Sequence, residues 1–218
     1  MAEDNRYLPA LRWKALTPVF DTAVRVTARE RVMKRRLLDQ AGVAACDSVL
    51  DLGAGTGTLA IWQKQRCPEA TVTGLDADPE VLARARRKAA DAGCEIDFVE
   101  GFSTELPFEA ESFDVVLSSL FFHHLMPADK RSTLAEVQRV LKPGGHLHVA
   151  DWGKPGDPLM AALSLSIRAF DGFEVTAENL RGALPSLFVQ ARLENAQERQ
   201  RLRTTLGTLA LYSAQKPA

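Results

Sequence analysis

The sequence predicts an α/β fold in which the strands of a mostly parallel sheet alternate with helices. Two observations support this prediction. Residues 49–52 form a short apolar run typical of a buried strand, and a glycine-rich turn then leads into a helix that begins near Thr58. Further apolar runs alternate with helix-like segments as far as residue 215. With 218 residues, the chain is long enough for one such domain with a sizeable core.

The composition is that of an ordinary globular protein and argues against two classes of function. Hydrophobic residues make up 46% of the chain and charged residues 25%, and the net charge is -1. No overall basic field is therefore available to hold nucleic acid. No apolar run approaches the roughly 18 residues that a membrane span needs, and the polar start is unlike a signal peptide. We therefore expect a cytoplasmic protein.

The three cysteines, Cys46, Cys67 and Cys94, are scattered and lack the C-x-x-C spacing of many metal and redox sites. We expect them to be reduced thiols that are buried or half-buried. A structural zinc site or a disulfide framework is not expected, which suits a reducing compartment.

The residues before the first strand predict an N-terminal helical cap at 1–45, followed by the main domain at 46–218. Pro9 and Pro18 interrupt the apolar pattern, so short helices or turns are expected at the start. A helix is expected over 28–41, ended by Gly42. Basic side chains concentrate between residues 25 and 36. They fit a solvated helix face or, alternatively, a contact with an anionic acceptor or RNA.

The glycine-rich turn indicates the kind of ligand. Gly53, Gly55 and Gly57 follow the spacing G-x-G-x-G, not the G-x-G-x-x-G of dinucleotide sites, and Asp51 lies two residues before the first glycine. A carboxylate here would repel a phosphate but attract an ammonium group. The ligand therefore looks nucleoside-like with a positively charged end, as in S-adenosylmethionine (SAM). Glycine-rich turns also occur without ligands, and that alternative stays open.

A second acidic position follows the next strand, which we expect at 71–75. Asp76 ends this strand, 19 residues beyond Gly57, close to the roughly 20 expected for a carboxylate that binds ribose hydroxyls. Asp78 is expected to cap a helix that has Pro79 at its first position. Gly93 is expected to end this helix.

The remaining elements are expected in the following order. Strands at 95–100 and 112–120 precede a helix at 128–141, a bend at 142–145 and a strand at 147–150. An apolar insertion on the acceptor side covers about 153–175. Thr176 is expected to cap a helix that runs to 184, and Pro185 to kink or restart it. The chain then ends in two strands, at 196–205 and 207–215.

Several segments in this order resemble the class I SAM-dependent methyltransferases. VLDLGAGTG resembles motif I, GLDADPEVL motif II, the dyad Phe113-Asp114 the start of motif IV, and LKPGG the bend before the fifth strand. The resemblance covers about 49–215, and the layout is similar to that of quinone-biosynthesis C-methyltransferases. It implies a Rossmann-like, seven-stranded, mostly parallel sheet with an antiparallel last strand, helices on both faces and an N-terminal helical lid. In motif IV, the Asp is mostly a structural turn residue.

The resemblance also implies where the cofactor lies. The expected cofactor contacts are Asp51, Gly53, Ala54, Gly55, Gly57, Asp76, Ala77, Phe102, Ser103, Ser118 and Ser119. One position departs from the family pattern, because Phe102 stands where an Asp usually accepts a hydrogen bond from the adenine amino group. A phenyl ring can pack against adenine instead, and the backbone N–H of Ser103 can reach a ring nitrogen.

The segment FFHHLMP after the fourth strand is the expected acceptor-side loop. His123 and His124 have ordinary pKa values near neutrality, and we expect His123 to act as a general base or to orient the acceptor. The alternative is that both histidines only pack locally. Because no H-x-x-x-H spacing or acidic partner lies nearby in the sequence, no metal is expected. The expected acceptor contacts are Tyr7, Trp13, Phe20, His123, His124 and Trp152.

These features predict a SAM-dependent methyltransferase that acts on a small, partly hydrophobic organic acceptor and releases S-adenosylhomocysteine. In-line displacement at the methyl group needs mainly positioning of the acceptor. The alternatives are an RNA methyltransferase that uses the basic stretch, and a non-catalytic SAM-binding protein. The glycine spacing and Asp51 argue against a nicotinamide oxidoreductase. A monomer or homodimer is expected, without nucleic acid or a membrane span.

Overall fold

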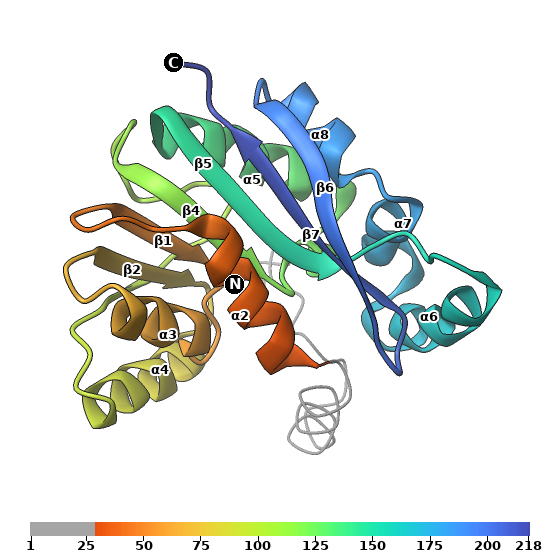
Figure 1. Cartoon of the computed structure of the whole chain (residues 1–218), viewed down its shortest axis with the longest axis horizontal. Helices are drawn as coiled ribbons and strands as arrows, with labels where there is room; N and C mark the ends of the chain where they lie inside the picture. Colours follow the sequence, from red (N-terminus) through yellow and green to blue (C-terminus); the bar gives the residue numbers. More distant parts are fainter. Residues whose placement is uncertain (1–28) are drawn as a thin grey trace, which may run out of the picture.

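The structure, a computed structural model, describes residues 29–218 and confirms the predicted fold (Figure 1). Seven strands form one sheet in the order β3-β2-β1-β4-β5-β7-β6. Neighbouring strands from β3 to β5 are parallel, whereas β7 runs antiparallel to both β5 and β6. The last strand in sequence is therefore the antiparallel one, as predicted.

The first half of the described chain alternates helix and strand. Its elements are α2 (Glu30–Ala41), β1 (Ser48–Leu52), α3 (Thr58–Arg66), β2 (Thr71–Asp76), α4 (Pro79–Asp91) and β3 (Asp97–Glu100). The carboxylate of Asp78 accepts hydrogen bonds from the backbone N–H groups of Glu80 and Val81, and Pro79 lies in the first turn of α4. The predicted helix cap is therefore confirmed.

The second half adds the helices that follow β5 and the two strands that close the sheet. Its elements are β4 (Phe113–Ser119), the 3-10 helix η1 (Phe122–His124), α5 (Pro127–Val140), β5 (Leu141–Trp152), α6 (Pro158–Asp171), α7 (Phe173–Arg181), α8 (Leu184–Gln190), β6 (Glu194–Arg203) and β7 (Thr208–Gln215). Pro185 lies in the first turn of α8, so the predicted helix restart is confirmed.

Two hydrophobic cores lie on opposite faces of the sheet. Successive strand residues point to opposite faces, so Val49 packs in one core and Leu50 in the other. The first core includes residues of α2, α3 and α4, and the second includes residues of α5 and α8. In Figure 1, α2 accordingly crosses in front of the sheet while α5 lies behind it. This double cover explains why the strands read as apolar runs.

The topology also indicates where a ligand would bind. β1 lies between β2 and β4, so the order in which strands are added reverses at β1. In open α/β sheets, ligands bind beyond the carboxyl ends of the strands at such a switch point. The glycine turn after β1, Asp76 at the end of β2 and η1 after β4 all lie at this edge.

Thr176 was wrongly predicted to cap a helix. It lies inside α7, where its buried hydroxyl donates a hydrogen bond to the carbonyl of Gly172, four residues earlier. A threonine hydroxyl can satisfy a helical carbonyl in this way as well as cap a helix, so its position in sequence did not distinguish the two roles. The helix ends at Arg181, before Gly182 in the left-handed conformation, and does not run to 184.

The bend predicted at 142–145 is part of β5. Phe113 of β4 pairs with Leu141, whereas Val115 pairs with His146, so β5 carries extra residues that bulge out of register. Gly144 has a φ of +77°, which a side chain would disfavour. The strand therefore starts before the bulge, not after it.

The thiols are only partly as expected. All three cysteines are free, and Cys67 and Cys94 are half-buried, but Cys46 is exposed. None of the helices described between residues 29 and 218 is long and apolar enough to cross a membrane. Most of the predicted N-terminal cap, with Tyr7, Trp13 and Phe20, lies outside the described residues. Its described part, α2, packs against the sheet through Met33, Leu37 and Leu38.

Candidate cofactor and acceptor site

The three positions of the turn after β1 require glycine for different structural reasons. All three have a positive φ, and the backbone N–H groups of Gly53 and Ala54 donate to the carbonyl of Leu75 at 2.9 Å. A Cβ added to Gly53 would lie 2.4 Å from the Phe121 ring, and one added to Gly57 would lie 2.8 Å from the Phe98 ring. At Gly55, a Cβ would meet nothing within 4 Å among the described residues. Gly53 and Gly57 thus permit close packing, whereas Gly55 faces open space.

Asp76 links the glycine turn to the loop after β2. One carboxylate oxygen accepts from Gly55 N at 2.8 Å, and the other accepts from Asp78 N at 3.1 Å. Burial raises the pKa of Asp76, and these backbone N–H groups oppose that effect. An ionised carboxylate has about four lone-pair positions, so two bonds leave room for the hydroxyls of a ribose.

Asp51 is buried at the end of β1 on the face that α2 and α3 cover. One oxygen accepts from Ala60 N at 3.0 Å, but the other has no hydrogen-bond partner among residues 29–218. Burial raises the pKa of Asp51 to about 7, although the charge of Lys34 and the bond from Ala60 act in the opposite direction. A buried acceptor without a donor is costly, and a ligand ammonium group would supply the missing donor.

The expected contacts after β3 and β4 divide into exposed and engaged side chains. Phe102 is 45% exposed, so its ring is available to pack against a base. The Ser103 hydroxyl is buried and shares a hydrogen bond with Thr133 at 2.8 Å, and the Ser118 hydroxyl donates to the carbonyl of Leu52 at 2.9 Å. These two hydroxyls therefore connect elements of the protein. Ala77 and Ser119 are half-buried at the same edge.

These observations fit SAM as the cofactor. A buried carboxylate oxygen without a donor matches an ammonium group, Asp76 has free acceptor positions for ribose hydroxyls, and the Phe102 ring is exposed for adenine. The open space beside Gly55 lets the backbone approach the ligand closely.

The loop after β4 carries the expected acceptor side and packs directly on the glycine turn. Phe121 lies against Gly53, and Leu120 N donates to Ala150 O at 2.8 Å. Phe122 is buried in the core, which anchors η1 and leaves His123 and His124 next to the cofactor region. Both histidines therefore lie at the same edge of the sheet as the glycine turn.

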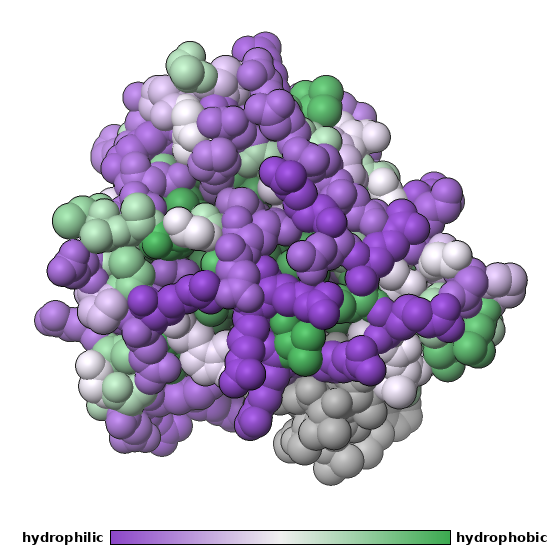
Figure 2. All heavy atoms as spheres, viewed as in Figure 1, coloured by the Kyte–Doolittle hydropathy of each residue, from purple (hydrophilic) through white to green (hydrophobic). Residues whose placement is uncertain are grey.

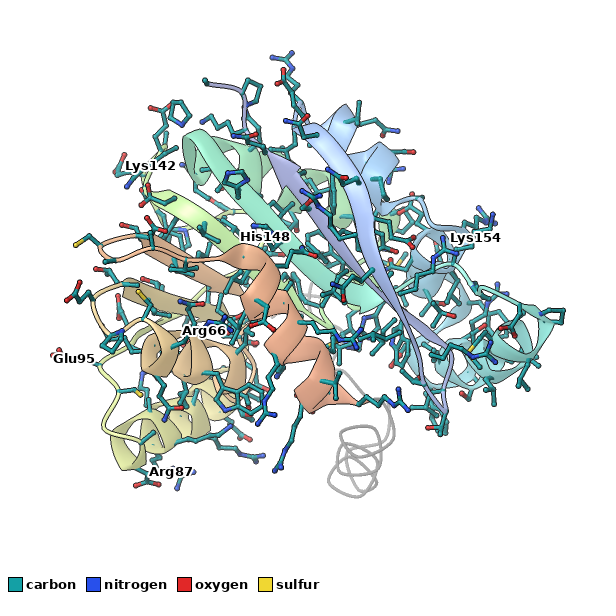
Figure 3. All side chains as sticks on the ribbon, viewed as in Figure 1. Arg66, Arg87, Glu95, Lys142, His148 and Lys154 are labelled. Atoms are coloured by element: carbon teal, nitrogen blue, oxygen red, sulfur yellow. The ribbon has the colours of Figure 1, made fainter. Side chains whose placement is uncertain are left out.

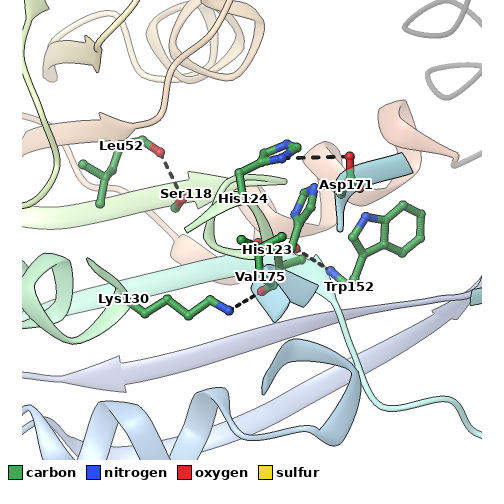
Figure 4. A network of polar contacts seen from close by, with 9 residues as sticks. Leu52, Ser118, His123, His124, Lys130, Trp152, Asp171 and Val175 are labelled. Atoms are coloured by element: carbon green, nitrogen blue, oxygen red, sulfur yellow. Dashed lines mark hydrogen bonds and ion pairs between the residues drawn. The ribbon is translucent and has the colours of Figure 1, made fainter. Parts of the chain in front are cut away.

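Four side chains form what we call the acceptor cluster: His123, His124, Asp151 and Asp171. His123, His124 and Asp171 are labelled in Figure 4. His123 Nδ1 lies 2.6 Å from Asp151 Oδ1, and the backbone N–H of His123 donates to Asp151 Oδ2 at 3.3 Å. Asp151 is the next-to-last residue of β5 and also accepts from Trp152 N at 2.6 Å. Asp171 Oδ2 lies 3.7 Å from His123 Nε2, and its Oδ1 lies 4.0 Å from His124 Nδ1.

The two histidines of the cluster differ in proton affinity. Burial disfavours the charged form of His123, but the charge and the hydrogen bond of Asp151 outweigh burial and raise the pKa of His123. Burial and the charge of His123 lower the pKa of His124. Burial opposes ionisation of Asp151 too, yet His123 holds the pKa of that carboxyl below its usual range. The sequence assigned no role to Asp151 or to Asp171.

Lys130 and Trp152 are two buried side chains near the acceptor cluster. Lys130 is fully buried, and its Nζ donates to the carbonyl of Val175 at 2.6 Å and lies 3.7 Å from Glu178. This contact ties α5 to α7. Trp152 is also buried, with its ring centroid 6.3 Å from that of His123. Sequence reasoning missed Lys130, because a lysine on an amphipathic helix is normally solvated.

A groove lined by basic side chains lies elsewhere, between α2 and β6. Arg36, Arg199 and Arg201 line it. Arg199 donates to Ser213, Arg201 pairs with Glu198, and Arg36 donates to Gln200. In Figure 2, this face is mostly hydrophilic, while hydrophobic atoms gather near α6. None of the residues that line this groove belongs to the glycine turn, the loop after β2 or η1.

Comparisons with known proteins agree with this geometry. Residues 49–145 match a family described as a methyltransferase domain. A demethylmenaquinone methyltransferase of Thermus thermophilus is 43% identical over 122 residues, which make up 56% of this chain and 54% of that protein. A ubiquinone/menaquinone biosynthesis C-methyltransferase of Hahella chejuensis is 36% identical over 157 residues, or 71% of this chain and 60% of that protein. The chain thus spans somewhat more than half the length of these relatives.

Two solved structures share the fold. A SAM-dependent methyltransferase from Methanosarcina mazei has a TM-score of 0.66 at 24% identity, covering 80% of this chain and 94% of that chain. The YcgJ protein of Bacillus subtilis has a TM-score of 0.68 at 20% identity, covering 86% and 99%. The motifs, the sheet order and the matched domain together show that the chain belongs to the class I SAM-dependent methyltransferases. Within that class, it is similar to the quinone-biosynthesis enzymes named above.

Proposed function

We propose that the protein transfers the SAM methyl group to a small, partly hydrophobic organic acceptor of the quinone-precursor type. The contact between the glycine turn and η1 carries this proposal. Phe121 packs on Gly53, and two residues later His123 enters the acceptor cluster. Cofactor and acceptor sites are therefore neighbours along one rigid edge, as a direct methyl transfer requires.

The names of the relatives support the acceptor class. The Thermus and Hahella proteins are a demethylmenaquinone methyltransferase and a ubiquinone/menaquinone C-methyltransferase. A ring of this kind needs an apolar wall and a few polar contacts. Trp152 and the apolar helix α6 supply the first, and the acceptor cluster supplies the second.

The side chains divide the work as follows. Bound SAM supplies an electrophilic methyl group on sulfonium. Asp51 and Asp76 hold its ammonium group and ribose, and Phe102 packs on its base. Asp151 fixes Nδ1 of His123 at 2.6 Å, so Nε2 is the atom that faces the acceptor side. His123 then orients a polar group of the acceptor, and buried Trp152 excludes water.

Two alternatives make different predictions. An RNA methyltransferase would use the basic groove of Arg36, Arg199 and Arg201, and its RNA affinity would fall steeply with salt. A non-catalytic SAM-binding protein would bind the cofactor tightly and methylate nothing. Neither alternative accounts for His123 being held by Asp151 beside the glycine turn.

Titration calorimetry with SAM, S-adenosylhomocysteine and NADH tests the cofactor first. We expect SAM and S-adenosylhomocysteine to bind and NADH not to bind. Radiolabelled SAM is then incubated with demethylmenaquinone in oxidised and reduced form, with total RNA as the competing acceptor. Label in the quinone supports the proposal, and label in RNA only would replace it. His123→Asn is expected to lower kcat at least about 100-fold without changing SAM affinity.

A further inference from the structure

Three ligand-type groups converge in the acceptor cluster without bonding to one another. One ring nitrogen from each of His123 and His124 and one carboxylate oxygen of Asp171 lie within 4.8 Å of one another. The Asp171 carboxylate lies 3.7 Å from His123 Nε2 and 4.0 Å from His124 Nδ1, which is longer than the roughly 2.7–3.2 Å of an N–H···O hydrogen bond. In Figure 4, both imidazoles lie beside Asp171. Within residues 29–218, no other three His, Cys, Asp or Glu side chains are grouped in this way.

These separations are close to those that a metal ion imposes. Nitrogen and oxygen ligands lie about 2.0–2.2 Å from zinc, which puts the ligand atoms of a tetrahedral site roughly 3–3.5 Å apart. The two pairs that include Asp171 need to contract by about 1 Å or less, and the histidine pair, which lies within 4.8 Å, by at most about 1.8 Å. Side-chain rotation at His124 and Asp171 can supply this movement, because neither side chain hydrogen-bonds to another group among residues 29–218.

The surroundings of His123 are those of a metal-bound histidine. A ligating histidine almost always donates its other ring N–H to a carboxylate or carbonyl, which fixes the tautomer and the ring. His123 Nδ1 has such a partner in Asp151 at 2.6 Å. Asp151 is itself fixed by the backbone N–H groups of His123 and Trp152. Nε2 of His123, which lies 3.7 Å from Asp171 Oδ2, is therefore the ring nitrogen left for an ion.

Charge and access also favour a cation. Asp151 and Asp171 bring two carboxylates into a largely buried cluster, and a divalent ion would balance both. The buried amine of Lys130 is already engaged by Val175 and Glu178. The cluster is open on one side, because the side chains of His124 and Asp171 are 31% and 12% exposed. This opening provides an entry path and an unfilled coordination position.

We propose that His123 Nε2, His124 Nδ1 and the Asp171 carboxylate bind a divalent transition-metal ion of the zinc type, with Asp151 as the outer partner of His123. Two imidazoles and one carboxylate favour zinc, cobalt, manganese or iron over magnesium and calcium, which prefer oxygen ligands only. The expectation of no metal rested on the lack of an acidic partner near the histidines in sequence. The fold supplies that partner from the end of α6.

The open coordination position suggests how the ion would act on the acceptor. This step rests on the proposed function. A hydroxyl of the acceptor that coordinates the ion loses its proton more readily, because the ion stabilises the oxyanion. The O–H bond breaks, the proton passes to bulk water, and the oxygen stays on the ion. His123 thus orients the acceptor through the ion, and no side-chain base is needed.

Zinc titration of the chelator-stripped, full-length protein tests the site. Calorimetry is expected to show one tight zinc site per chain. Asp171→Asn and His124→Gln are expected to weaken it by more than about 100-fold, and Asp151→Asn by about 10–100-fold, the usual cost of losing an outer partner. Zinc is also expected to raise the Tm of the wild type but not that of Asp171→Asn. Equal zinc affinity in the wild type and both ligand variants would overturn the proposal.

The chain offers matched controls. His146 and His148 alternate along β5 with ring centroids 5.9 Å apart and form a rival imidazole pair; His148 is labelled in Figure 3. Cys46 is an exposed thiol. His146→Gln and Cys46→Ser are expected to leave zinc affinity unchanged. Loss of the tight site in either control, with retention in Asp171→Asn, would place the ion elsewhere and remove the proposed site.

SAM affinity, measured on the same samples, separates this proposal from the proposed function. SAM binding without a zinc site overturns the metal proposal and leaves the methyltransferase assignment intact. A zinc site that depends on Asp171 in a protein that does not bind SAM upholds the metal proposal and removes the proposed function. Circular dichroism of each variant shows whether it is folded, and His124→Gln serves as the second ligand variant if Asp171→Asn is not.

Discussion

The cofactor region and the acceptor cluster are built in different ways. The cofactor region consists of a turn of five residues with Asp51 just before it and Asp76 one strand away, and its contacts are largely backbone N–H groups. The acceptor cluster joins side chains from η1, the end of β5 and the end of α6. A site made by a short local motif can be recognised in the sequence, whereas a site assembled from distant segments needs the fold.

Substitutions at two glycines of the turn should have the largest effects, one on stability and the other on SAM binding. Gly53→Val would place its Cβ only 2.4 Å from the Phe121 ring, so we expect a loss of roughly 3 kcal/mol or more in the free energy of unfolding. Gly55→Val faces open space and should cost only about 1–2 kcal/mol for its positive φ. It should nevertheless abolish SAM binding by filling the ligand's space. Denaturant unfolding and calorimetry of both variants measure this; a Gly55→Val protein that binds SAM normally would move the cofactor away from the turn.

Substituting Asp51 should raise the stability of the protein and lower its affinity for SAM. Its pKa is raised to about 7, so between pH 4 and 7 the folded protein binds a proton that the unfolded chain has lost, and stability falls as pH rises. Asn in its place removes this penalty, and we expect Asp51→Asn to be more stable at pH 8 by a few kcal/mol, at about 1.4 kcal/mol per pKa unit. The difference should shrink toward pH 4. SAM affinity should fall because the ammonium group loses its ionic partner.

Denaturant unfolding at pH 5 and pH 8 measures the stability of both proteins, and calorimetry measures SAM affinity. A variant that is less stable than the wild type at pH 8 would show that Asp51 stabilises the unliganded fold. The carboxylate would then be a structural residue and not one reserved for the ligand.

The sequence anticipated the cofactor region better than the acceptor cluster for a physical reason. β1, its turn, α3 and Asp76 follow from apolar runs, glycines and one spacing, all read within 30 residues. The Asp78 cap was predicted because capping is a local interaction. Asp171 and Lys130 could not be predicted, since their partners His123 and Val175 are brought to them only by the packing of α6 and α7. The prediction for Thr176 was wrong for a related reason, because its hydroxyl can either cap a helix or bond to a carbonyl within one.

Removing one carboxylate from each region should have smaller effects, and these effects can be compared directly. Asp76→Ala is expected to weaken SAM binding by roughly 1–3 kcal/mol, the cost of leaving ribose hydroxyls unpaired. Asp171→Asn is expected to leave SAM affinity unchanged and to lower the rate of methyl transfer. Calorimetry and single-turnover assays on the two variants separate these effects. If Asp76→Ala binds SAM as the wild type does, the ribose assignment is lost; if Asp171→Asn weakens SAM, the two regions are not independent.

The smallest effect concerns the position that departs from the family pattern. Phe102 is 45% exposed, so Phe102→Ala removes little buried area and should hardly change the free energy of unfolding. It should weaken SAM binding by about 0.5–1.5 kcal/mol, the contribution of one aromatic contact with the base. Phe173→Ala, at an exposed ring on α7, is the matched control and should have no effect on SAM binding.

Phe102→Asp restores the usual family residue. Its carboxylate is expected to accept a hydrogen bond from the adenine amino group, which the 6-oxo group of an inosine analogue of SAM cannot donate. Discrimination against that analogue should therefore appear in Phe102→Asp and be weak in the wild type, because a phenyl ring senses the face of the base and not its edge.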